Sequence, residues 1–235
     1  MTPAAPRLAD VNAAPESMLP AALAARLPDS TSAAPWSVRA EAIIWWHRAA
    51  PAAAAVVPDA LSEARSLPLT VGAMVRYLDT PVGAYSEIVG VPRLVLSGGA
   101  PAATIPFIAV DSVASVAGGR AHWALPKVLA TFSWLGLESV QASGDGWSVG
   151  VGVRLRGPAL PLAAAFPVLQ PFPDETGAGA GTVLRRSTVR GAGRARPATV
   201  TVSTTGTSLP LWLTTGRFPG VVLPSVRAVI GAPRG

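Results

Sequence analysis

The sequence has no cysteine, a single lysine and two histidines. The absence of cysteine excludes disulfides, thiolate zinc sites and a cysteine nucleophile. Because His47 and His122 are the only imidazoles in 235 residues, we expect no histidine-based metal centre. Charged residues make up 14% of the chain, against roughly 25% in an ordinary soluble domain, and 50% of the residues are hydrophobic. This balance excludes a disordered polyelectrolyte and predicts a sizeable buried core.

The sequence shows no targeting segment and no convincing membrane span. Its first residues mix acidic side chains with prolines, instead of a basic stretch followed by an apolar one. The longest apolar stretch, 158–172, is too short for a span and contains four prolines. We therefore expect a soluble, cytoplasmic protein that does not enter a membrane.

Alternating apolar and polar residues favour a fold built mainly of strands. Residues 36–47 and 146–155 alternate most clearly, and the first of these places Arg39 on the face opposite Trp36 and Val38. Further strands are expected at 70–78, 83–91, 92–97, 104–110, 182–189, 198–204, 210–214 and 224–230. Short helices are expected at 16–28 and 49–57, and from an Asp111 or Ser112 N-cap to a stop at Gly118-Gly119.

This pattern predicts an α+β fold that is mainly antiparallel β, with a few short helices. We expect residues 1–35 to form an N-terminal extension with a short helix and residues 36–235 to form one domain.

Lys127 is the only lysine beside 18 arginines. A coding bias that replaces lysine by arginine explains the excess of arginine, and it makes the retained lysine a candidate for chemistry that guanidinium cannot perform. An amine can lose its proton and attack a carbonyl, whereas arginine stays protonated. The neighbours of Lys127 are apolar, so we expect desolvation to lower its pKa. The alternative is a lysine whose stem lies on Trp123 and whose ammonium reaches water.

The segment GRAHWALPK (119–127) resembles the signature of the acetoacetate decarboxylase superfamily, in which Gly-Arg leads to Pro-Lys and that lysine forms a Schiff base. VGAYSEIVGV (82–91) resembles the strand that presents the family's active-site glutamate, and matching back from VVP (56–58) places Arg39 on the family's arginine. The resemblance covers about residues 36–130. Two positions depart from it: Val128 replaces a second lysine and Ala121 replaces a glutamate.

The resemblance implies a barrel- or cone-like fold and Schiff-base decarboxylation of a small keto acid. Lys127 would be the nucleophile, Glu87 would assist proton transfer and Arg39 would hold the substrate carboxylate. The substrate-binding candidates are Tyr85, His122 and Trp123. No metal or organic cofactor is implied, because the iminium itself accepts electrons, and a homo-oligomer is expected.

Several alternatives stay open at this point. The same iminium supports aldol or dehydration chemistry, and the fold could serve as a non-catalytic module that binds a small ligand. Glu87 could pair with a surface arginine, Arg39 could be a solvated strand residue, and Trp123 could be part of the core. RRSTVRGAGRAR (185–196) has five arginines but no aromatic platform, so we expect no nucleic-acid binding.

Overall fold

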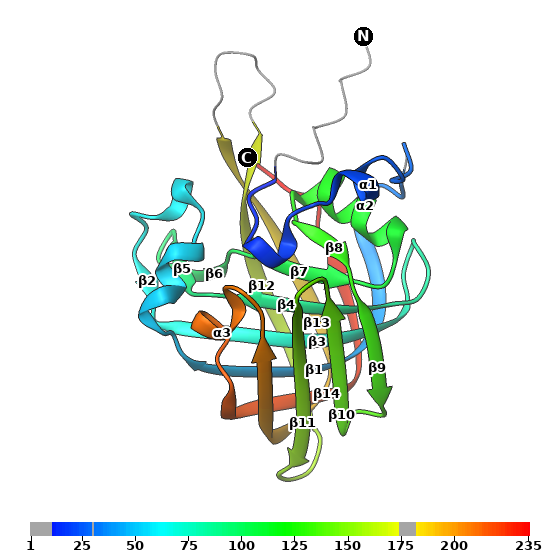
Figure 1. Ribbon diagram of the computed structural model, residues 1–235. Coiled ribbons are helices and arrows are strands. Elements are labelled where there is room, and N and C mark those ends of the chain that lie inside the picture. The colour runs from blue at the N-terminus through cyan, green and yellow to red at the C-terminus, as the bar shows by residue number, and fades with distance from the viewer. Residues whose placement is uncertain (1–10, 30, 174–181) are drawn as a thin grey trace.

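The structure is a computed structural model that describes residues 11–29, 31–173 and 182–235. These residues form one sheet of fourteen strands with a few short helices (Figure 1). The helices are α1 (Ala21–Ala24), α2 (Val113–Trp123) and α3 (Leu209–Trp212), with 3-10 turns η1 (Pro15–Ser17), η2 (Pro51–Val56) and η3 (Asp59–Leu61). The strands are β1 (Trp36–Arg48), β2 (Ser66–Leu67), β3 (Leu69–Asp79), β4 (Tyr85–Val91), β5 (Leu94–Ser97), β6 (Ala100–Ala103), β7 (Phe107–Val110), β8 (Lys127–Leu129), β9 (Thr131–Leu135), β10 (Ser139–Gly144), β11 (Trp147–Leu155), β12 (Leu160–Pro173), β13 (Thr182–Thr205) and β14 (Gly216–Ile230).

The strand order confirms the expected α+β, mainly antiparallel fold. The main path runs β2-β5-β6-β12-β13-β14-β1-β3-β4-β7-β8, and β9, β10 and β11 join it through the pairing of β11 with β13. Only the β6–β12 and β7–β8 pairs are parallel within the described part of the chain. The path has two ends, so the sheet curls without closing into the barrel that the resemblance implied.

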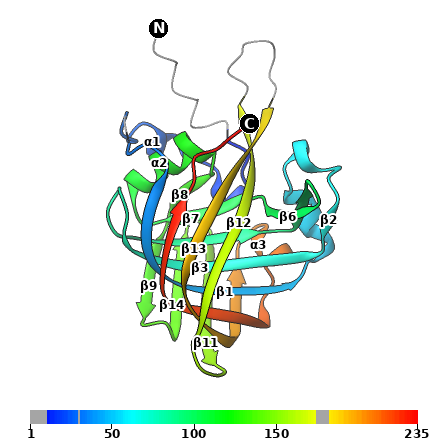
Figure 2. The same ribbon diagram turned by 180° about the vertical axis from the view of Figure 1, so that it is seen from behind.

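The curled sheet packs against itself in two layers. In Figures 1 and 2 the strands β1, β3 and β4 run across the molecule, whereas β9–β11 run steeply past them. Ile43, Met74 and Ile88 project from one face of β1, β3 and β4 into the main core, which they share with Val149 and Val200 of β11 and β13. Because successive strand residues point to opposite faces, the residues between them face the other way, into the concave side of the sheet. The site described below lies on that concave side.

Several predicted elements differ from the structure. The helix predicted at 16–28 is reduced to η1 and the four residues of α1, and the helix predicted at 49–57 is the 3-10 turn η2. Residues 210–214 do not form a strand, because the short helix α3 lies there. Helical spacing places Leu209, Trp212 and Leu213 on one side, and all three are buried in the core. Helix α2 does not stop at Gly118-Gly119 but continues to Trp123. Both glycines are needed for packing, since a Cβ on Gly118 would lie 2.5 Å from the Trp36 ring.

The predicted strands 182–189 and 198–204 are parts of one 24-residue strand, β13. The intervening segment remains extended because Gly193 lets β13 approach β14 closely: a Cβ there would lie 2.2 Å from the carbonyl oxygen of Ser225. A register shift between Arg194 and Arg196 marks the same place.

The described part of the N-terminal segment contacts the sheet and the loop before α3. The Ser17 hydroxyl bonds to the backbone of Ile108 on β7, and the Glu16 carboxylate accepts hydrogen bonds from Ser208 and Leu209. No helix in the described ranges is long and apolar enough to cross a membrane.

Candidate active site

Lys127 is the first residue of β8 and lies beneath helix α2. The Ser112 hydroxyl caps that helix by accepting a hydrogen bond from the backbone of Ser115. One turn later, Gly119 leaves room for the lysine stem, since a Cβ there would lie 2.5 Å from Lys127 Cδ. The Lys127 Nζ donates to Ser115 Oγ at 2.9 Å.

A carboxylate from a distant part of the chain meets this ammonium. Glu87 on β4 places Oε2 2.7 Å from Lys127 Nζ, and the two side chains are only 6% and 4% exposed. The residues are brought together by β7, which pairs with β4 on one side and with β8 on the other. The fold therefore brings Lys127 and Glu87, both catalytic candidates from the sequence, together as a buried ion pair.

Two tyrosines surround the ion pair. Tyr77 lies opposite Tyr85 across β3 and β4, and their rings stack with centroids 4.5 Å apart. The Tyr77 hydroxyl donates to Glu87 Oε1 at 3.1 Å. Tyr85 presents its ring 5.1 Å from Lys127 Nζ and its hydroxyl 3.5 Å from the same atom. Glu87 is thus held from two sides, by a phenol and by an ammonium.

The charges of this cluster correct one expectation. Burial by itself lowers the pKa of Lys127, but the Glu87 carboxylate and the hydrogen bonds to the ammonium outweigh it, so the net pKa is raised above its ordinary value. Burial also raises the pKa of Tyr85 and, with the charge of Glu87, raises that of Tyr77 well above 10. The raised pKa keeps the Lys127 side chain an ammonium at neutral pH, and this corrects the neutral amine expected from the apolar neighbours.

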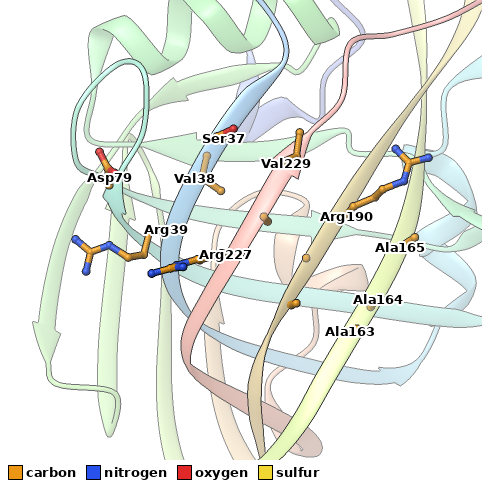
Figure 3. Close-up of a pocket in the computed structure, with 13 residues that line it drawn as sticks. Ser37, Val38, Arg39, Asp79, Ala163, Ala164, Ala165, Arg190, Arg227 and Val229 are labelled. Carbon is orange, nitrogen blue, oxygen red and sulfur yellow. The ribbon is translucent and has the colours of Figure 1, made fainter.

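Arg39 does not join this cluster. It is exposed on the outer face of β1, where it lies across from Arg227 of β14 and from Asp79 of β3. Figure 3 shows these side chains in an open groove of about 910 Å³ on that outer face. The alternation of β1 decides this, because Val38 and Ala40 occupy the concave side and Arg39 points the other way. The assignment of Arg39 to a substrate carboxylate beside Lys127 is corrected accordingly.

His122 and Trp123, at the end of α2, face a different part of the molecule from Lys127. Trp123 donates from Nε1 to the Gly231 carbonyl at 2.8 Å and packs edge-on against Trp36, with centroids 4.9 Å apart. His122 packs edge-on against Trp123 at 5.6 Å, and burial lowers its pKa. These contacts give both residues structural surroundings, and none of them reaches the Lys127–Glu87 pair.

Arg120 fixes the backbone of the lysine rather than its amine. Its buried guanidinium donates from Nε to the Lys127 carbonyl at 2.7 Å and from Nη2 to the Ser17 carbonyl at 3.1 Å. Burial lowers its pKa to about 10. The Gly-Arg of the motif thereby joins α2, β8 and the N-terminal segment.

Sequence reasoning missed Tyr77 and Ser115. Ser115 lies three residues after the helix cap, a spacing that a capping analysis can detect, but its approach to Lys127 depends on the turn that follows α2. Tyr77 reaches Glu87 only through the register of β3 and β4, which no local pattern in the sequence specifies.

A hollow of about 270 Å³ lies on the concave side next to the cluster. Tyr77 and Val75 form its inner end, and they lie directly opposite Tyr85 and Glu87 on the next strand. The remaining lining comes almost entirely from apolar side chains of β1, β12, β13 and β14. The site therefore combines a buried ion pair with an adjacent apolar space.

A model of the family "Acetoacetate decarboxylase (ADC)" matches residues 19–160, which is more than half of the chain. The chain belongs to the acetoacetate decarboxylase family. The matched region includes all five residues of the cluster around Lys127. Among curated protein sequences, none matches the chain at a significant level.

Solved structures of acetoacetate decarboxylase family members and related enzymes share the fold. Acetoacetate decarboxylase from Legionella pneumophila subsp. pneumophila has a TM-score of 0.62 at 16% identity, over 88% of this chain and 89% of that chain. An acetoacetate decarboxylase-like enzyme from Sphingomonas wittichii gives 0.63 at 14% identity, over 86% and 93%. The enduracididine biosynthesis enzyme MppR, complexed with pyruvate, gives 0.60 at 12% identity, over 86% and 90%. Family membership supports an enzyme with lysine-dependent chemistry, while the specific reaction is a separate question.

Proposed function

We propose that this family member is a Schiff-base-forming lyase that decarboxylates a small keto acid through Lys127. The observation that carries the proposal is the buried Lys127–Glu87 ion pair at the Pro-Lys of the family motif. A buried carboxylate 2.7 Å from an ammonium stabilises the positive charge of the ammonium and is also a base that can accept its proton.

The first half of the reaction builds the iminium. Glu87 accepts a proton from Lys127 Nζ, and the neutral amine attacks the ketone carbon to give a carbinolamine. Glu87 returns the proton to the carbinolamine oxygen, which leaves as water, and the iminium cation remains opposite the Glu87 carboxylate. Tyr77 keeps Glu87 aimed at the nitrogen by donating to its other oxygen.

The second half releases the products. In a β-keto acid, the bond between the α-carbon and the carboxylate breaks, and its electron pair moves to the iminium nitrogen as CO2 leaves. The enamine is then protonated on carbon, and water hydrolyses the resulting iminium to free the ketone and Lys127. Ser115 and Tyr85 orient the nitrogen throughout, because their hydroxyl oxygens lie 2.9 and 3.5 Å from it in the resting site.

The position of Arg39 favours a second candidate: aldol or dehydration chemistry through the same iminium. Arg39 lies on the outer face, so the arginine that the resemblance offered for the substrate carboxylate is not beside Lys127. MppR, a structural neighbour, has been solved with the condensation product of pyruvate and imidazole 4-carboxaldehyde. Measuring CO2 release separates the two reactions.

Reductive trapping tests the proposal directly. The protein is incubated with acetoacetate or pyruvate and borohydride, and intact mass is followed by peptide mapping. We expect one adduct per chain at Lys127, which Lys127→Arg abolishes; since the sequence has no other lysine, the α-amino group is the only competing amine. An adduct confined to the N-terminus, or one that survives the substitution, contradicts Schiff-base chemistry and leaves a ligand-binding module as the explanation.

A further inference from the structure

The concave face of the sheet is hollow because its central positions carry small side chains. Paired residues share a face, so the register defines a row that runs from Tyr77 through Ala40, Val226 and Gly193 to Leu162. A neighbouring row runs from Val38 through Ala228 and Gly191 to Ala164. Alanine and glycine flank Val226 in the first row and fill the two middle positions of the second, and the 270 Å³ hollow lies over both rows.

The hollow and the cluster around Lys127 share one residue, Tyr77. Tyr77 lines the hollow and also donates to Glu87, whose carboxylate holds Lys127. Val75, two residues before Tyr77 on β3, also lines the hollow and pairs directly with Glu87 on β4. Adjacent strands are about 4.8 Å apart, so the backbone of Val75 at the inner end of the hollow is one strand spacing from that of Glu87.

The chemistry of the lining specifies what can occupy this space. Apart from Tyr77 at the inner end and Arg194 at the rim, the side chains that line it are apolar. The exposed Arg194 is engaged with the Ala159 carbonyl. A volume of 270 Å³ corresponds to about nine water molecules at roughly 30 Å³ each, and an apolar lining offers such waters few hydrogen bonds. A hydrocarbon chain fits this surface better than water or a charged group does.

We propose that the hollow is a subsite for the alkyl tail of the substrate, so that the substrate class is a straight-chain 3-oxo acid longer than acetoacetate. The inference rests on the proposed Schiff-base function of Lys127. The keto carbon lies at the inner end, beyond Tyr77, and the tail extends across β1, β14 and β13 toward β12. Burial of each added methylene strengthens binding about fourfold, which corresponds to about 0.8 kcal/mol per CH2.

The test is a chain-length series with a matched pair of variants. Acetoacetate, 3-oxohexanoate and 3-oxooctanoate are trapped at Lys127 with borohydride, and the half-saturating concentration of each acid is measured by intact mass. We expect it to fall about fourfold per methylene until the hollow is full. Ala164→Leu puts a larger side chain into the outer part of the hollow from the exposed strand β12 and should remove the advantage of the longest acid.

Ala163→Leu is the control. Ala163 is next to Ala164 on β12, but it lines the outer groove (Figure 3) and does not line the hollow. Ala42→Leu, at the inner end, should restrict trapping to acetoacetate and gives a second variant if the first alters β12.

Each result bears on a distinct claim. Equal half-saturating concentrations for all three acids, with acetoacetate still trapped at Lys127, overturn the subsite and leave the proposed function intact. If no acid is trapped at Lys127, the proposed function fails as well. If Ala164→Leu changes the oligomeric mass but not the chain-length preference, a second copy covers the hollow and the inference is wrong.

Discussion

At the scale of single residues, the partner of Lys127 matters more than its sequence neighbours. The apolar residues beside the lysine suggest a neutral amine, yet Glu87, 40 positions earlier in the chain, reaches its nitrogen and raises its pKa. The cost of removing two charges from water is offset by their mutual attraction and by the hydroxyls of Tyr77 and Ser115. Lys127 and Glu87 are therefore coupled both in stability and in catalysis.

This coupling predicts a non-additive pair of substitutions. Lys127→Met leaves the Glu87 carboxylate buried without its counter-ion and should cost about 3 kcal/mol of unfolding free energy at pH 7. The double variant Lys127→Met/Glu87→Gln removes both charges and should recover most of that loss. Urea unfolding of the parent, both single variants and the double variant measures the cycle. Additive costs would show that the two charges do not interact, contrary to the geometry described above.

At the scale of elements, two glycines allow helix α2 to pack closely over the site. Gly119 admits the stem of Lys127 and Gly118 admits Trp36, so the helix lies close to both the site and the core. The N-cap at Ser112 orients the first turn, and that turn carries the Ser115 hydroxyl. Glycine, normally unfavourable within a helix, is retained here because there is no room for a Cβ.

Gly119→Ala should impair the site more than the fold. Alanine favours the helix, but its Cβ would displace the lysine stem, and a displacement of about 1 Å at a reacting group costs roughly 10²-fold in rate. The rate of reductive trapping at Lys127 and the melting temperature are measured together.

Ser112→Ala is the control for this prediction. It removes the cap at a cost of about 1 kcal/mol and loosens the turn that carries Ser115 without displacing the lysine stem, so it should slow trapping much less than Gly119→Ala does. A Gly119→Ala variant that traps at the parental rate would show that the lysine stem has other room.

At the scale of the whole molecule, the protein contains buried groups whose protonation opposes folding. Burial lowers the pKa of His47, which packs on Phe218 and is only 7% exposed, and it lowers that of His122. Below about pH 6.5 the unfolded chain binds protons that the folded chain resists, so stability falls as the pH falls. The pKa of Glu16 is also lowered, because the hydrogen bonds that its carboxylate accepts from Ser208 and Leu209 outweigh the effect of burial. The stability that Glu16 contributes is lost only when the pH falls below about 4.5.

The melting temperature should therefore decline between pH 6.5 and 5, before the carboxylates titrate. Each kcal/mol lost corresponds to about 2–4 °C for a chain of this size. His47→Gln should flatten the decline, because it removes one of the two groups that gain a proton on unfolding. Calorimetry of parent and variant across this range checks the slope, and parallel curves would assign the decline to His122 or to other groups.

Much of the architecture followed from local patterns. Alternation predicted the strands that became β1, β3, β4 and β11, because period-two burial is a property of neighbouring residues alone. The alternation also placed Arg39 correctly on the face opposite Trp36 and Val38, whereas the resemblance to the family's arginine assigned it a role on the other side of the strand. The predictions of a strand at 210–214 and of a helix end at Gly118-Gly119 were wrong, because packing against distant side chains outweighs local propensity.

By itself, the sequence determined that Lys127 is the sole lysine available for Schiff-base chemistry, that disulfides are excluded, and that the chain folds as a mainly antiparallel α+β protein. The protonation state of Lys127, the placement of Tyr77 and Ser115, and the apolar hollow on the concave face were decided by the tertiary structure. The physical reason is that charge partners and cavities depend on strand register and sheet curvature, which bring together residues far apart in the chain.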